Sequence, residues 1–143
     1  MNTIIAFFFS VIIFVFAGAM ALNLFHENGQ ILDRGLAEAT VREIQSKVDI
    51  YCRDPFTSEI FDVDYPGQIE MYVDTDKVCT FQEDSPSDYI YCKKFLCEVQ
   101  MCDSTGTCAE GKSIIFEEGA VASIYRFVMT REGQKIKIQF DNS

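Results

Sequence analysis

Six cysteines carry the clearest chemistry in this sequence, and all of them follow a long uncharged N-terminal run: Cys52, Cys79, Cys92, Cys97, Cys102 and Cys108. Their even number predicts a set of disulfides whose pairing the sequence leaves open. Cys102 and Cys108 flank a short turn, which predicts a bridge between them, and Cys52 is expected to tie a helix end to a sheet. Zinc or an iron–sulfur cluster is the alternative, but the close C-x2-C pairs of such sites are missing.

Other residues offer little for catalysis. His26 is the one histidine, and no serine or cysteine near it in sequence could form a nucleophile–base pair with it. Asp62 and Asp64 share a predicted strand face and Asp74 and Asp76 bracket a turn, so a weak calcium site competes with a solvated acidic surface. The sequence therefore predicts no enzyme, no cofactor and no metal, with the acidic residues on the surface.

The element that must place the cysteines begins with residues 4–24, IIAFFFSVIIFVFAGAMALNL, which carry no charge. About 20 apolar residues are enough for a helix to cross a bilayer. Three interpretations compete: a secretory signal cleaved in the small-residue stretch 17–21, a membrane anchor, or a stem that packs against its own copies in a filament. We call residues 1–25 the stem, and expect it to be retained and to pack through Phe7, Phe8, Phe9, Ile12, Phe14, Phe16, Gly18, Ala19, Leu22 and Phe25.

Topology signals around the stem conflict. The first basic residues, Arg34 and Arg42, follow it and would place the remainder in the cytoplasm, whereas six cysteines favour an oxidising exterior. A short basic leader that preceded Met1 and was removed at the N-terminal edge of the apolar run would remove the conflict.

Charge is distributed unevenly over the 143 residues, whose formal net charge is −10. Residues 49–88 hold eleven acids and two bases, whereas residues 89–143 hold seven of each. The acidity argues against nucleic acid as a direct ligand, because phosphate binding needs a basic face. It also suggests that the acidic region of one copy faces Lys135 or Lys137 of another.

Periodicity predicts an α+β fold: a long N-terminal hydrophobic and amphipathic helix, then a small antiparallel, disulfide-stabilised β head. Apolar residues at helical spacing (Ala37, Val41, Ile44, Val48 and Tyr51) extend one helix over residues 1–51, with a kink near Gly29. Residues 1–25 form its hydrophobic part, 26–51 its amphipathic part, and 52–143 the head. Alternation and turn residues predict strands at 61–65, 69–73, 77–82, 89–93, 95–102, 121–130 and 135–140.

The charge-free helix, the amphipathic helix and the strand-Pro-Gly-strand segment FDVDYPGQIEMYVD (61–74) resemble an archaeal type IV pilin-like protein. Position 5 is Ile5, where bacterial pilins commonly place a Glu. The resemblance implies a helical homo-oligomeric filament outside the cell, with subunits held in the membrane before assembly. It also implies a prepilin peptidase, an assembly ATPase and a membrane platform as partners.

The sequence-based conclusion is thus a non-enzymatic filament subunit for adhesion or surface interaction. Two alternatives stay open: a single-pass membrane-anchored binding protein with a disulfide-rich extracellular head, and a secreted binding module without the stem.

Overall fold

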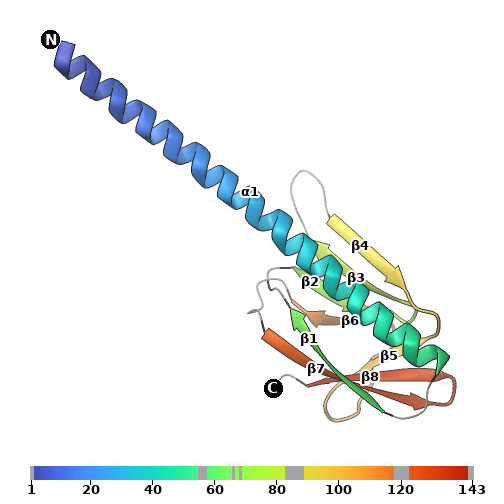
Figure 1. The fold of residues 1–143 in the computed structure, drawn as a ribbon. Coiled ribbons are helices and arrows are strands. Elements are labelled where there is room, and N and C mark those ends of the chain that lie inside the picture. Colours follow the sequence, from blue (N-terminus) through green and yellow to red (C-terminus); the bar gives the residue numbers. More distant parts are fainter. Residues whose placement is uncertain are drawn as a thin grey trace. The chain divides into compact units, whose positions relative to one another are not determined.

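The computed structural model describes residues 2–54, 58–65, 67, 69–82, 89–117 and 123–141. It contains helix α1 (Asn2–Arg53) followed by eight strands (Figure 1). The chain divides into two compact units, Met1–Leu32 and Asp33–Ser143. The first unit is helical, and the second combines the last turns of α1 with all the strands. From here on the head means this second unit, which is larger than the predicted head of residues 52–143 because it includes residues 33–51 of α1.

Helix α1 runs through Gly29 as one continuous helix, so the chain has no break in helical structure there. Proline is missing throughout α1, and its Ala, Leu and Met residues are good helix formers. The Ser10 hydroxyl donates a hydrogen bond to the Ala6 carbonyl oxygen (2.9 Å), which satisfies this polar group within the helix. By length and composition α1 can cross a membrane, a property it shares with signal sequences.

In the head, one face of α1 belongs to the core. Its buried residues are the five predicted from helical spacing: Ala37, Val41, Ile44, Val48 and Tyr51. The opposite, solvent-exposed face of α1 carries the Arg42–Glu38 ion pair (2.9 Å), which spans one helical turn. The amphipathic pattern is therefore confirmed, and α1 ends at Arg53, two residues beyond the predicted limit.

Two four-stranded sheets complete the head. Sheet A has the order β1 (Glu59–Tyr65), β7 (Ser123–Glu132), β8 (Lys135–Asp141) and β5 (Val99–Cys102), and sheet B has the order β4 (Tyr89–Lys94), β3 (Lys77–Gln82), β2 (Glu70–Val73) and β6 (Ser113–Phe116). All the pairs are antiparallel except β5 with β8, which is parallel. The head is therefore not purely antiparallel, and β1 and β2, the consecutive strands of the segment 61–74, lie in different sheets (Figure 1).

The strand pattern differs from the prediction at two other places. Strand β6 was not predicted, because its register shifts against β2 between Met71 and Tyr72 and leaves Ile115 and Phe116 both buried, without alternation. Residues 95–98 connect β4 to β5 instead of belonging to a strand. The predicted loop at residues 83–87 and the start of the strand predicted at 121 lie outside the described residues.

Aromatic side chains fill the centre of the core. The Tyr65 and Phe116 rings are stacked with centroids 4.1 Å apart, and Phe116 also meets Tyr125 at 4.4 Å. Phe61 stacks on Phe127 across β1 and β7 (5.3 Å). These rings join sheet A to β6 of sheet B, so the two sheets share one core with α1.

Candidate functional site

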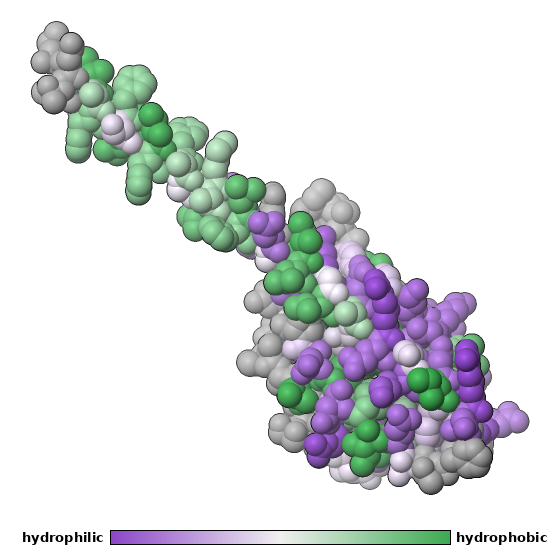
Figure 2. Space-filling view, in the orientation of Figure 1, coloured by the Kyte–Doolittle hydropathy of each residue, from purple (hydrophilic) through white to green (hydrophobic). Residues whose placement is uncertain are grey.

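The stem exposes apolar side chains in every direction. Each side chain from residue 5 to residue 25 is exposed, and Phe14 reaches 81%. Consecutive residues of an α-helix point about 100° apart, so Phe7, Phe8 and Phe9 cover most of the circumference. On the face seen in Figure 2 the stem is predominantly hydrophobic, in contrast to the mostly hydrophilic head. A helix that is apolar all round needs an apolar environment on all sides.

Small residues separate the large side chains in the C-terminal third of the stem. A Cβ added to Gly18 would meet no atom within 4 Å, and Ala19 is exposed beside it. Small residues allow neighbouring helices to approach closely. The remaining predicted packing residues, Ile12, Phe16, Leu22 and Phe25, are also exposed and available to a neighbour.

All six cysteines form disulfides within the head: Cys52–Cys97, Cys79–Cys92 and Cys102–Cys108. The predicted Cys102–Cys108 bridge is confirmed. Cys52, near the end of α1, is joined to the β4–β5 connection, where the Asp49 carboxylate also accepts a hydrogen bond from the Leu96 amide (2.9 Å). None of these sulfurs is available as a nucleophile or metal ligand.

Strand β4 is fastened to α1 by polar contacts. Arg42 Nε donates to the Tyr91 hydroxyl oxygen (2.9 Å), and the Tyr89 hydroxyl donates to the Glu38 carboxylate. The Arg34 guanidinium lies over the Tyr89 ring, 4.9 Å from its centroid. Burial, and then the hydrogen bond to Glu38, raise the pKa of Tyr89 well above its ordinary 10.0, so its hydroxyl stays protonated at neutral pH. These contacts hold an edge strand in place.

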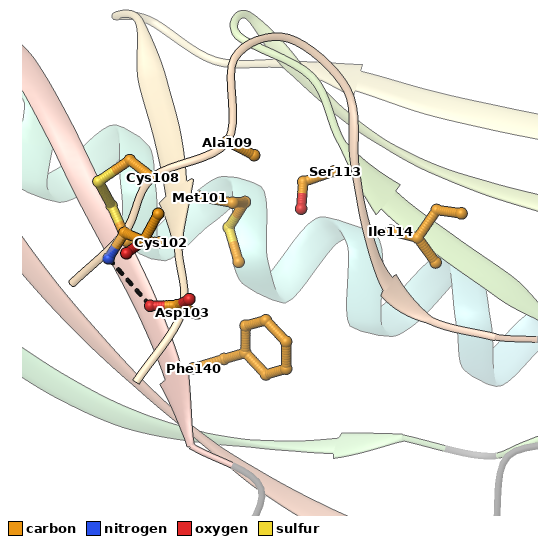
Figure 3. A pocket seen from close by; sticks show the side chains of 9 residues that line it. Met101, Cys102, Asp103, Cys108, Ala109, Ser113, Ile114 and Phe140 are labelled. Carbon is orange, nitrogen blue, oxygen red and sulfur yellow. Dashed lines mark hydrogen bonds between the residues drawn. A yellow bond between two sulfur atoms is a disulfide. The ribbon is translucent and has the colours of Figure 1, made fainter. Parts of the chain in front are cut away.

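A hollow of about 370 Å³ lies between β5, β6, β8 and the loop closed by Cys102–Cys108 (Figure 3). Met101, Phe140 and Ile114 line it with apolar surface, and Asp103 is the one carboxylate among the described residues that line it. Asp103 Oδ1 already accepts hydrogen bonds from the hydroxyl and amide of Thr105 and from the amide of Thr107, and these bonds lower the pKa of Asp103. The Asp103 carboxylate therefore stabilises the turn formed by residues 103–107. The described residues of the hollow do not provide the convergent polar groups typical of a ligand site.

The other candidate groups do not converge. Asp62 pairs with Arg126 (3.0 Å) and Asp74 with Lys77 (3.9 Å), whereas His26 lies exposed on α1 in the first unit. Across the described ranges, no three His, Cys, Asp or Glu side chains are grouped so that they could hold a metal ion.

The two lysines predicted to meet an acidic neighbour have partners in their own head. Lys135 pairs with Glu98 (3.9 Å), and Lys137 pairs with Glu132. They are therefore weaker candidates for a contact between copies than lysines without such pairs.

Exposed isoleucines on the strands were missed by the sequence-based reasoning. Ile60, Ile90, Ile114 and Ile124 are each 48–61% exposed. The signal was an apolar residue at a position where alternation predicts a polar one, as at Ile60 directly before buried Phe61.

Comparison of the chain with family models, curated proteins and solved structures found no match.

Proposed function

We propose that this protein is a structural subunit of an extracellular, type IV pilus-like filament, as its resemblance to archaeal pilin-like proteins implies. The stem would reside in the membrane before assembly and afterwards be buried among the stems of identical subunits. The heads would form the outer layer, where disulfides protect them.

One observation carries this proposal: an uncharged helix, exposed and apolar on all sides, continues without a break into the helix of a disulfide-linked head. Burying one large apolar side chain contributes about 1.5–3 kcal/mol. Eight of the predicted packing residues are large apolar side chains with at least half of their surface exposed, so their burial between copies would provide a strong driving force for assembly.

The remainder of the structure supports a scaffold role. All cysteines are consumed in disulfides, and Asp62 and Asp74 are engaged in ion pairs. In the hollow beside β6, the carboxylate of Asp103 is occupied by its own turn. An adhesive or surface-binding role would follow from repetition of the head along the filament. The peptidase, ATPase and membrane platform belong to the same proposal.

Electron microscopy of material sheared from the cell surface tests the proposal, together with mass spectrometry of its peptides. Filaments whose subunits retain residues 5–25 are expected. Recovery of the chain only as a monomer in membranes would contradict the proposal and favour the membrane-anchored binding protein. A soluble head without the stem would contradict it and favour the secreted module.

A further inference from the structure

A shallow groove runs along the head between α1 and β1. It has a volume of about 230 Å³ and is lined by Leu36, Ala39, Thr40, Glu43, Asp64 and Tyr65. We call it the acidic groove. Leu36 is 46% exposed and Ala39 is exposed, so aliphatic surface is open to solvent.

Hydrogen bonds fix the floor of the acidic groove. The buried Thr40 hydroxyl lies 3.0 Å from the Leu36 carbonyl oxygen and 3.1 Å from that of Asp64, which joins α1 to β1. Glu43 and Asp64 are exposed on its rim. Neither carboxylate forms an ion pair with any residue that the structure describes. The groove is therefore a preformed apolar surface bordered by two uncompensated negative charges.

The outer face of sheet B has the opposite character. Val73 and Val78 are buried in the core, so the alternate residues of β2 and β3 point away from it. Register pairs place Cys92, Cys79, Tyr72 and Ile114 in one row across the four strands, with Ile90, Phe81 and the acidic Glu70 in the row beside it. Ile90 is 59% exposed, and Ile114, which also lines the hollow beside β6, is 48% exposed. We call this surface the lysine-rimmed face.

Its rim is basic. Lys94 lies directly opposite Lys77 in the β3–β4 register, and like charges in this arrangement repel each other. The Lys112 ammonium lies 3.6 Å from the centre of the Tyr72 ring. Among the described residues, Lys77 reaches Asp74 at 3.9 Å, whereas Lys94 and Lys112 have no ion pair. This face therefore presents an apolar centre with two uncompensated ammonium groups.

We infer that the acidic groove of one subunit binds the lysine-rimmed face of a second copy of this chain. The two surfaces match in chemistry, since both expose aliphatic side chains, and they are opposite in charge. Because they are different surfaces of one head, their contact is head-to-tail, and such a contact repeats from subunit to subunit when it does not close into a ring. The inference rests on the proposed filament function and assigns Lys94 and Lys112 the role first expected of Lys135 and Lys137.

Charge reversal with rescue tests this contact in the full-length chain. Glu43→Lys with Asp64→Lys reverses the groove, and Lys94→Glu with Lys112→Glu reverses the face. Each pair of substitutions is expected to lower the mass of sheared, pelletable filament about tenfold, which corresponds to about 1.4 kcal/mol per contact. The quadruple variant restores opposite charges and is expected to recover most of the filament mass.

The control is Asp54→Lys, which changes the net charge by +2, half the change of the reversed groove, at an exposed site beyond the end of α1 and outside both surfaces. It is expected to assemble as the wild type does. Disulfide content of each variant verifies that its head is folded. If a reversed head fails to fold, Glu43→Gln with Asp64→Asn takes its place, and a loss of about threefold, or roughly 0.6 kcal/mol, is expected.

The outcomes separate this inference from the proposed function. If the wild type forms no filament, the proposed function is wrong. If the wild type forms filaments and the reversed or neutral variants assemble equally well, the groove-to-face contact is wrong and the filament function stands. Failure of the quadruple variant to recover, with its head folded, also overturns the contact.

Discussion

Removing the three disulfides one at a time should destabilise the head in a fixed order. The bridges differ mainly in the length of chain that they close: sequence separations of 45 for Cys52–Cys97, 13 for Cys79–Cys92 and 6 for Cys102–Cys108. A cross-link stabilises by restricting the unfolded chain, and this effect grows with the logarithm of loop length. The chain-entropy relation gives losses of about 4, about 3 and about 2 kcal/mol, in that order, when both cysteines of a bridge become alanine.

Urea unfolding of the full-length protein in detergent, followed by near-ultraviolet circular dichroism, measures these losses. Alanine is the right replacement because Cys79 and Cys102 are buried and a serine would bury a hydroxyl there. Ser46→Ala, at an exposed site on α1, is the matched control and should change the unfolding free energy by less than about 0.5 kcal/mol. An unchanged free energy for all three variants, or the largest loss at Cys102–Cys108, would refute the reasoning.

Three further predictions follow from burial and hydrogen bonding. Phe14→Ala should leave the unfolding free energy of the head unchanged, because this ring is 81% exposed. The same substitution should weaken filament assembly by about 2 kcal/mol per subunit. Phe127→Ala, at a fully buried ring, should instead lower the unfolding free energy by about 3–5 kcal/mol. Thr40→Val removes a buried hydroxyl that has two carbonyl partners, so it should lower the free energy of urea unfolding by about 1 kcal/mol. An unchanged unfolding free energy would mean that these hydrogen bonds do not stabilise the head. Tyr89 has a folded-state pKa raised above 10.0, so the stability it contributes is complete below that pH and is lost as the pH rises further. The stability difference between wild type and Tyr89→Phe should therefore shrink above about pH 10, and a constant difference from pH 7 to 12 would contradict the assignment.

Features determined by local periodicity were predictable from the sequence. The buried face of α1 follows from apolar residues three and four apart, which lie on one side of a helix wherever it packs. The β7–β8 hairpin follows from two alternating runs joined at Gly133, whose φ of 66° suits glycine. The Cys102–Cys108 bridge belongs to the same class, because a short turn brings its two residues together.

Features determined by contacts between distant residues were not predictable. The Cys79–Cys92 bridge depends on the β3–β4 register, which places these residues directly opposite each other. The parallel pairing of β5 with β8 joins strands more than 30 residues apart, and nothing local specifies it. Strand order across a sheet follows from packing of the whole core, so the division into sheets A and B could not be read from the strand pattern.

The candidate surfaces also differ in whether the sequence alone reveals them. The stem is visible in the sequence because its lack of charge is a property of one continuous run. The lysine-rimmed face is assembled from Ile90, Lys94, Lys112 and Ile114, which come from separate segments and share a face only after folding. Charge counts along the chain therefore identified an acidic region. The lysines proposed to meet it, Lys135 and Lys137, already have partners in their own head.

A photo-crosslinking residue placed at Phe14 gives the most direct measurement of where the stem lies. The side chain at this position is exposed in the single chain, so irradiation of cell-surface material will mark whatever covers it. The filament account predicts a ladder of products at multiples of the subunit mass of 16.3 kDa, joined through residues of the stem. Irradiation that yields only lipid adducts of single subunits would contradict it.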